Sequence, residues 1–153
     1  MGKTMAEGFA SAGANLFLVS RNLAEAEAAA SEIQESYQTK AIGYEADVTD
    51  EGAVDEMVKD ALSAFGQIDV LVNNAGINRR GSIEEVSYDD FKEVQNVNVN
   101  GVWLCSRAVL PHMKERACGR IINLSSALGL VGIPNRTPYT ASKGAVTQLT
   151  RAL

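Results

Sequence analysis

Tyr139 and Lys143 form the pair of residues in this sequence with the clearest chemical potential. They are four residues apart in a stretch that predicts a helix, so their side chains share one helix face. A free phenol releases its proton reluctantly at neutral pH, and a neighbouring ammonium stabilises the phenolate. Ser126, thirteen residues before Tyr139, could hydrogen-bond a substrate oxygen beside the phenol. Because such a Tyr–Lys pair is also typical of solvated helix faces, its interpretation as a general acid/base needs support from other residues.

Four short apolar runs, which predict strands, alternate with stretches of helical spacing. The runs are solidly apolar, which is typical of parallel strands that are covered on both faces. This pattern predicts the α/β class with a doubly wound parallel sheet. Strands are expected over residues 16–19, 40–45, 68–72 and 119–124, and helices over residues 3–12, 23–37 (with Asn22 as a cap) and from the cap Asp50 to Phe65.

Two further helices are expected in the second half of the chain. Ser87 and Asp90 form a variant of the capping box, which predicts the start of a long helix. That helix is expected to run to Leu110 with a bend, despite Gly101 and Pro111. The last helix begins at Tyr139.

Polar residues follow each predicted strand. In open parallel sheets, ligands bind at the carboxyl ends of the strands. The sequence therefore predicts one rim formed by Ser20–Arg21, Asp47–Val48, Asn74–Gly76 and Ser125–Ser126.

The composition excludes several classes of function. The chain has 153 residues and a net charge of −5, with Lys and Arg scattered along it, so no nucleic-acid partner is expected. No apolar run approaches the ~20 residues of a membrane span, so no membrane partner is expected. The two cysteines, Cys105 and Cys118, form neither a metal cluster nor a disulfide framework. We therefore expect no metal and a cytoplasmic location.

Several short motifs follow one another in a defined order. They are Asn73-Asn74-Ala75-Gly76 after a strand, Asn98 in a helix, Ser125-Ser126 after another strand, and Tyr139-Thr140-Ala141-Ser142-Lys143. In this combination the sequence resembles the short-chain dehydrogenase/reductase family, over essentially all residues from Gly2 to Leu153. The resemblance implies a Rossmann-type fold with helices on both faces of the sheet and a nicotinamide cofactor. It also implies hydride transfer to or from a small-molecule carbonyl or secondary alcohol.

The resemblance implies catalytic roles for four residues. Tyr139 matches the general acid/base, and Lys143 matches the residue that holds the nicotinamide ribose and assists the tyrosine. Ser126, the second serine of its pair, matches the residue that positions the substrate oxygen. Asn98 matches an asparagine that anchors a water molecule in the proton relay.

The assignment of Asn98 has alternatives. Asn96 and Asn100 are close by, and the distance to Gly101 favours Asn98. The plainer interpretation is an asparagine at a helix bend that bonds its own backbone.

A cofactor site is also implied by the resemblance. Asp47 matches the acid that bonds the adenine amino group, with Val48 against the ring, and residues 74–76 match the segment along the adenosine ribose. NAD enzymes have an acid where this chain has Ser20-Arg21-Asn22, and Arg21 suits a 2′-phosphate. We therefore expect NADP(H), with NAD(H) as the alternative. The expected cofactor-binding residues are Gly2, Ser20, Arg21, Asn22, Asp47, Val48, Asn74, Ala75, Gly76, Tyr139 and Lys143.

Relative to this family, both ends of the chain look cut. Only Gly2 matches the glycines of the phosphate loop, and the first central strand and the last strands have no counterpart. We therefore expect residues 1–153 to be a partial NAD(P)-binding Rossmann domain that is inactive as it stands. By resemblance, the intact protein is expected to be a homodimer or homotetramer that pairs through the helices at residues 87–116 and from Tyr139 onward.

Several expectations about substrate and surface remain open. Two substrate classes compete, 3-oxoacyl thioesters and sugar acids or other polyols. Arg79-Arg80 could face an anionic substrate, although a solvated loop is the commoner role. His112 is interpreted as structural or solvated, and Trp103-Leu104 as core or subunit interface. The alternative to an enzyme is a non-catalytic Rossmann module that binds a nucleotide or a partner chain, and the Ser126, Tyr139 and Lys143 set argues against it.

Overall fold

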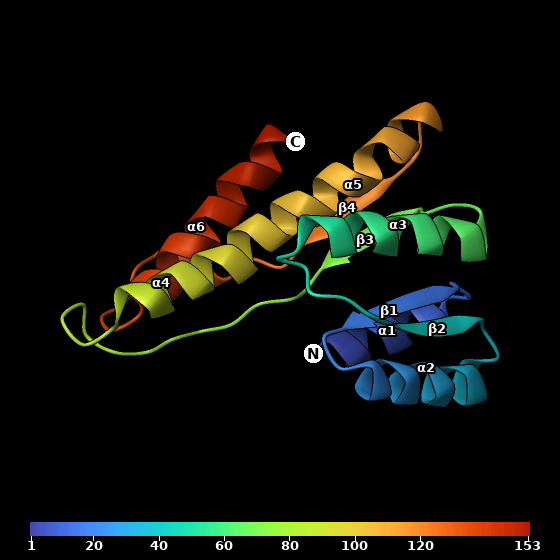
Figure 1. The fold of residues 1–153 in the computed structure, drawn as a ribbon, viewed down its shortest axis with the longest axis horizontal. Coiled ribbons are helices and arrows are strands. Elements are labelled where there is room, and N and C mark those ends of the chain that lie inside the picture. The colour runs from blue at the N-terminus through green and yellow to red at the C-terminus, as the bar shows by residue number, and fades with distance from the viewer. The chain divides into compact units, whose positions relative to one another are not determined.

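The computed structural model describes every residue from 1 to 153. The chain divides into two compact units, Met1–Gln67 (unit 1) and Ile68–Leu153 (unit 2). Each unit contains one sheet of two parallel strands, β1–β2 in unit 1 and β3–β4 in unit 2 (Figure 1). Helices and parallel strands alternate along the chain, so the expected α/β class is confirmed.

Unit 1 alternates helices and strands, and its helix ends are set by local chemistry. The elements are α1 (Gly2–Ser11), β1 (Leu16–Ser20), α2 (Leu23–Tyr37), β2 (Ala41–Glu45) and α3 (Glu51–Phe65). As expected, the side chain of Asn22 accepts a hydrogen bond from Glu25 N, and Asp50 accepts one from Ala53 N. Gly66 ends α3 in the left-handed conformation, where glycine has no side chain to clash.

The side chains of β1 and β2 alternate between two helical layers. Leu16 and Leu18 pack against a core of Ala6, Ala10, Ala30, Ile33 and Ala41, which places α1 and α2 on one face. Phe17 points the other way, with its ring 5.0 Å from that of Tyr44 and 6.3 Å from that of Phe65 on α3. Helices therefore cover both faces of this sheet, and Figure 1 shows the β1–β2 pair between α2 and α3.

Gly43 lets α2 lie directly on β2. A Cβ atom at this position would stand 2.5 Å from the carbonyl carbon of Ala26 and 2.7 Å from its oxygen. Those are backbone atoms, which cannot rotate away as the end of a side chain would. The absence of a side chain at Gly43 therefore sets the distance between the helix and the sheet.

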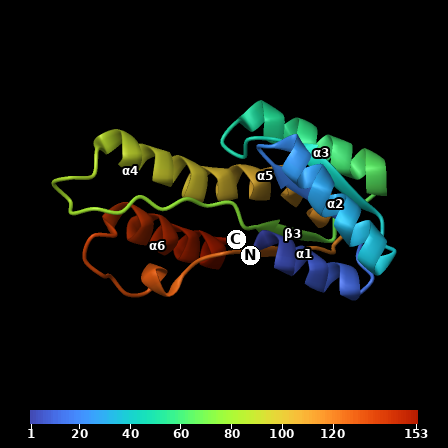
Figure 2. The same cartoon turned by 90° about the horizontal axis from the view of Figure 1, so that it is seen from below.

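Unit 2 is a two-stranded sheet with two long helical rods. Its elements are β3 (Val70–Asn73), α4 (Tyr88–Gln95), the π-helical turn η1 (Asn96–Asn100), α5 (Gly101–Glu115), β4 (Arg120–Asn123), the 3-10 turn η2 (Ala127–Gly129) and α6 (Thr137–Ala152). Figures 1 and 2 show α4, η1 and α5 as one long rod, with α6 beside α4. The N-cap Ser87 accepts a hydrogen bond from Asp90 N at 3.0 Å, as its capping-box pattern predicts.

Paired asparagines connect the sheet of unit 2 to its helices. Asn73 and Asn123 are partners in the β3–β4 register. The Nδ2 atom of Asn73 donates to Asn123 Oδ1 at 2.8 Å and to Ser106 Oγ on α5 at 3.2 Å. Asn123 Nδ2 donates to Thr150 Oγ1 on α6 at 3.0 Å. The carboxyl ends of both strands are thereby tied to α5 and α6.

The long helix after Ser87 differs from expectation in its interior. Its irregularity is not at Gly101 or Pro111: Pro111 lies inside α5, and the five residues Asn96–Asn100 form a π-helical turn. A π-helical turn contains one residue more than an α-helical turn and is frequent at functional sites. None of the helices is long and apolar enough to cross a membrane.

We predict that Gly43→Ala lowers the free energy of unfolding by about 1–3 kcal/mol, because a Cβ atom would overpack against α2. The matched control is Gly8→Ala on α1, where nothing lies within 4 Å of the added atom. The control should raise stability by about 0.5–1 kcal/mol, since alanine is the better helix former. Urea unfolding followed by circular dichroism measures both. If Gly43→Ala is as stable as the unsubstituted protein, α2 does not rest on β2 in the way described.

Candidate active site

The expected site residues fall into two groups. Unit 1 holds those at the ends of β1 and β2 together with Gly2, namely Gly2, Ser20, Arg21, Asn22, Asp47 and Val48. Unit 2 holds all the expected catalytic residues and the segment after β3, namely Asn74, Ala75, Gly76, Asn98, Ser126, Tyr139 and Lys143. Each group is described within its own unit.

Asn98 lies in η1 and is completely buried. Its Oδ1 atom accepts a hydrogen bond from Ile77 N at 2.8 Å, and its Nδ2 atom donates to Ile77 O at 2.9 Å. The second N–H of the same amide donates to Ser142 Oγ on α6 at 2.9 Å. One side chain therefore joins three segments, the loop after β3, the π-turn and α6.

The two alternatives to Asn98 lie elsewhere on the same turn. Asn100 Nδ2 donates to Asn96 Oδ1 at 2.9 Å, and both residues are exposed. The plainer interpretation of Asn98 is wrong, because its amide bonds the backbone of Ile77, not that of its own helix. Within this turn Asn98 faces inward while Asn96 and Asn100 face outward.

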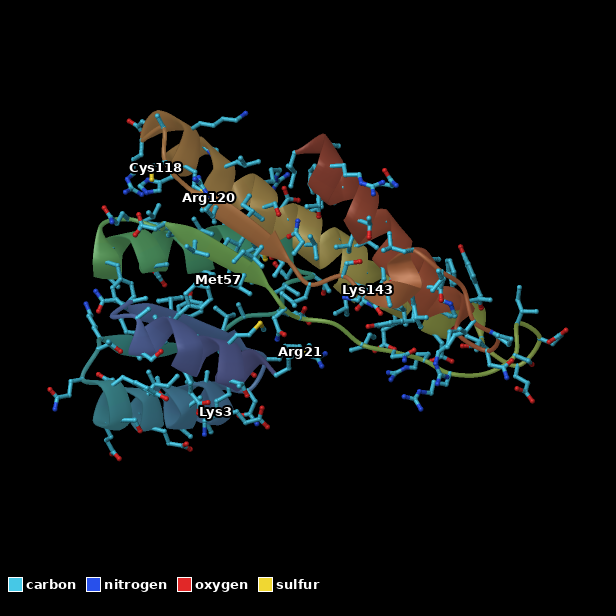
Figure 3. All side chains as sticks on the ribbon, turned by 180° about the vertical axis from the view of Figure 1, so that it is seen from behind. Lys3, Arg21, Met57, Cys118, Arg120 and Lys143 are labelled. Atoms are coloured by element: carbon cyan, nitrogen blue, oxygen red, sulfur yellow. The ribbon has the colours of Figure 1, made fainter.

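Lys143 places a buried ammonium beside Tyr139. Its Nζ atom donates to Leu124 O at the end of β4 at 2.5 Å and lies 5.6 Å from the centre of the Tyr139 ring. Burial lowers the pKa of the Lys143 ammonium below its ordinary value, since desolvation disfavours the charged form. Tyr139 itself is half-buried, one turn earlier on α6. Figure 3 labels Lys143 on this helix.

Gly76 lies close to this ammonium. A Cβ atom at Gly76 would stand 3.3 Å from Asn98 Oδ1 and 3.7 Å from Lys143 Nζ. A side chain at this position would therefore press against Asn98 and approach the amino group. The structure thus brings Gly76, Asn98 and Lys143 together.

The two serines after β4 have different contacts. Ser125 Oγ donates to Lys143 O at 2.9 Å and shares a hydrogen bond with Thr147 Oγ1 at 2.9 Å, so it fastens the end of β4 to α6. Ser126 Oγ accepts a hydrogen bond from Leu128 N at 3.2 Å and is the N-cap of η2. The Ser126 hydroxyl can therefore still donate its proton to another acceptor, whereas the Ser125 hydroxyl is engaged in hydrogen bonds that connect β4 to α6.

Asn74 has a polar atom without a partner. Its Oδ1 atom is buried and accepts no hydrogen bond within the protein. Ala75 and Gly76, which follow it, are exposed. An unpaired buried carbonyl of this kind is costly unless a donor reaches it.

The expected residues of unit 1 line the end of β1 and the loop after β2. Ser20 Oγ accepts a hydrogen bond from Asn22 N at 3.2 Å, and Asn22 is committed to capping α2. Asp47 Oδ1 accepts from Thr49 N at 2.9 Å and from Thr49 Oγ1 at 2.8 Å. The Thr49 backbone bond lowers the pKa of the Asp47 carboxyl below its ordinary value, and the positive charge of Arg21 adds to this effect.

Arg21, Val48 and Gly2 complete this group. Arg21 is exposed just beyond β1, and Figure 3 labels it there. Val48 is half-buried next to Asp47, and Gly2 is the half-buried first residue of α1. The cation at Arg21 and the carboxylate at Asp47 therefore belong to one electrostatic neighbourhood within unit 1.

Other residues singled out from the sequence have structural contacts. Arg79 is held by α4, with its guanidinium 2.8 Å from Glu93 Oε2 and 3.3 Å from Asp90 Oδ1. His112 Nε2 accepts a hydrogen bond from Ile68 N at 3.3 Å, in line with its structural interpretation. Trp103 is not a core residue, because it is 49% exposed, with Arg107 over its ring.

Two buried contacts beside Tyr139 escaped sequence reasoning. Gln95 Nε2 donates to Pro138 O at 2.8 Å, and Ser142 Oγ donates to Tyr139 O at 2.7 Å. Ser142 stands inside the Tyr139–Lys143 motif, which is the one signal that could have drawn attention to it. For Gln95 there is no such signal, because its partner is 43 residues away.

Comparison with known proteins gives consistent matches along the chain. A family model described as short chain dehydrogenase matches residues 1–153. The 2-(R)-hydroxypropyl-CoM dehydrogenase of Xanthobacter autotrophicus is 45% identical over 121 residues, which are 77% of this chain and 48% of that protein. The gluconate 5-dehydrogenase of Gluconobacter oxydans is 40% identical over 153 residues, which are 100% of this chain and 59% of that protein.

Solved structures show the same likeness. A gluconate 5-dehydrogenase from Burkholderia cenocepacia, in complex with NADP and tartrate, matches with a TM-score of 0.92 at 36% identity, over 97% of this chain and 58% of that one. The chain spans 48% to 59% of the length of the two curated relatives. Since the family model covers all of its residues, the chain belongs to the short chain dehydrogenase family.

Proposed function

We propose that the protein carrying this chain is an NADP(H)-dependent oxidoreductase that interconverts a carbonyl and a secondary alcohol, with Tyr139 as its general acid/base. One observation carries the proposal. In unit 2, Gly76, Asn98 and Tyr139 come from three separate segments and lie around the buried ammonium of Lys143. A phenol beside a buried cation suits proton transfer at a small substrate.

Three residues of unit 2 have separate roles in proton transfer. In reduction, the Tyr139 hydroxyl donates its proton to the carbonyl oxygen, and the Ser126 hydroxyl donates a hydrogen bond to the same oxygen. The charge of Lys143 stabilises the phenolate that remains, and its burial strengthens this interaction, because few water molecules screen it. In oxidation, the phenolate accepts the proton from the alcohol. The bound nicotinamide supplies or accepts the hydride.

The residues present fit a nicotinamide nucleotide. Lys143 has three N–H donors, of which Leu124 O takes one, so two remain for ribose hydroxyls. Gly76 has no side chain that would stand between a ribose and the ammonium, and the unpaired Asn74 Oδ1 offers an acceptor on the same segment. In unit 1, Asp47 is an ionised acceptor suited to the adenine amino group.

Arg21 favours the phosphorylated form of the cofactor. An exposed guanidinium binds a 2′-phosphate through charge-assisted hydrogen bonds, whereas a 2′-hydroxyl calls for an acid. Ser20, Arg21 and Asn22 contain no acid. NADP(H) is therefore the proposed cofactor, with NAD(H) as the alternative.

Further properties of the intact protein are proposed as well. Its proposed substrate is a 3-oxoacyl thioester or a sugar acid or other polyol. Because the guanidinium of Arg79 is paired with acidic residues of α4, Arg80 is the one of the two arginines that remains available to an anionic substrate. A homodimer or homotetramer is proposed, because Tyr88, Phe91 and Trp103 expose large apolar surfaces on α4 and α5. A cytoplasmic location is proposed from the free thiols of Cys105 and Cys118. The inactivity of the 153 residues alone stays a prediction.

We predict that Tyr139→Phe in the intact protein lowers kcat by about 100-fold or more, because it removes the proton donor. The dissociation constant for NADPH should stay within about twofold, since the ring remains in place. Tyr37→Phe at the end of α2 is the matched control and should change neither quantity. Unchanged turnover in Tyr139→Phe would contradict the proposed role and favour a non-catalytic nucleotide-binding module.

We predict that Arg21→Asp weakens NADPH binding by about tenfold or more, which corresponds to about 1.4 kcal/mol, because it sets an anion against the 2′-phosphate. NADH binding should be unchanged or tighter. Lys59 is an exposed residue on α3. Lys59→Asp makes the same charge change in the same unit and should change the binding of neither NADPH nor NADH. Fluorescence titration with both nucleotides measures the effect. An unsubstituted protein that binds NADH tenfold tighter than NADPH would overturn the assignment.

A further inference from the structure

The helix that carries Tyr139 begins without a side-chain cap. Arg136 is the N-cap of α6 and makes no capping hydrogen bond with its side chain. The helices α2, α3 and α4, by contrast, are capped by Asn22, Asp50 and Ser87. The first turn of an uncapped helix has unsatisfied N–H groups and frays readily. Since Tyr139 lies in that turn, other contacts must hold it.

Gln95 holds the residue before the tyrosine. It is the last residue of α4, and its Nε2 atom donates to Pro138 O at 2.8 Å. Pro138 is fully buried, so its carbonyl group is fixed in place relative to α4. The contact joins two segments that are 43 residues apart in the sequence.

Ser142 holds the tyrosine from the other side. It is completely buried, accepts Asn98 Nδ2 at 2.9 Å and donates to Tyr139 O at 2.7 Å. The backbone of Tyr139 is thus connected through one hydroxyl to the π-turn, and Asn98 is anchored in turn to Ile77. Without the Ser142 hydroxyl, one Asn98 N–H would be buried with no partner.

These contacts form two parallel connections between the helices. Gln95 and Asn98 lie on one helical rod, and Pro138 and Ser142 lie one turn apart on α6. Together they bracket Tyr139 and hold the first turn of α6 through its carbonyl groups. We propose that Gln95 and Ser142 are positioning residues that hold Tyr139 in register with Asn98 and Lys143. The inference rests on the proposed role of Tyr139, since a misplacement of about 1 Å in a catalytic group lowers the rate of reaction strongly.

Two substitutions remove these contacts with little change of shape. Gln95→Glu keeps the length of the side chain but sets a carboxylate against the Pro138 carbonyl, and Ser142→Ala removes the hydroxyl. The matched control is Ser106→Ala on α5. Ser106 is 2% exposed, accepts Asn73 Nδ2 at 3.2 Å and donates to Val102 O at 2.7 Å, so it loses the same kinds of bonds away from Tyr139.

The test combines steady-state kinetics of the intact protein with hydrogen exchange of backbone amides. Gln95→Glu and Ser142→Ala should lower kcat by about tenfold or more, while the NADPH dissociation constant stays within about twofold. The amide of Thr140, which donates to Arg136 O at 2.8 Å, should exchange about tenfold faster in both variants. Ser106→Ala should leave kcat and the exchange of Thr140 within about twofold.

The outcomes separate this inference from the proposed function. If both variants keep the kcat and the Thr140 exchange rate of the unsubstituted protein while Tyr139→Phe is inactive, the positioning role is wrong and the proposed function stands. If Tyr139→Phe keeps full turnover, the proposed function is wrong, and the exchange rate of Thr140 alone decides whether Gln95 and Ser142 hold the turn. Should Ser142→Ala fail to fold, Gln95→Glu and Gln95→Met carry the test.

Discussion

The buried side-chain amide of Asn98 connects the parts of unit 2 on which the candidate site depends. Both of its N–H groups and its oxygen are satisfied, by the backbone of Ile77 and by Ser142. A buried amide that loses one hydrogen-bond partner still pays the free-energy cost of having left water. Moving any one of the three segments away from Asn98 is therefore unfavourable, and the segments are held together. The loop after β3, the π-turn and the first turn of α6 thereby take one arrangement, and Gly76 and Lys143 are placed next to each other as a consequence.

The electrostatics of the site follow from this packing. Lys143 is buried against the end of β4, where its ammonium donates to Leu124 O, and burial lowers its pKa. A cation with spare donors beside a phenol ring can stabilise negative charge on the neighbouring oxygen. In unit 1, Arg21 and Asp47 form a second charged neighbourhood.

Local chemistry made much of the fold predictable from the sequence. The apolar runs gave all four strands within two residues of their ends, and Asn22, Asp50 and Ser87 cap the helices that their types and positions predicted. The π-turn was not predictable in this way, and the side chain of Asn98 at its centre bonds Ile77, 21 residues earlier. The pairing of Arg79 with Glu93 and of Gln95 with Pro138 likewise depends on contacts between distant segments. Motif order singled out Asn98, Ser126, Tyr139 and Lys143, whose catalytic roles stay predictions.

The central claim is that the space beside Lys143 and Gly76 receives the nicotinamide ribose. A crystal structure of the intact protein with NADP⁺ tests it most directly. The account predicts ribose hydroxyls within about 3 Å of Lys143 Nζ and next to Gly76. A nucleotide whose nicotinamide ribose lies away from Lys143 would contradict it.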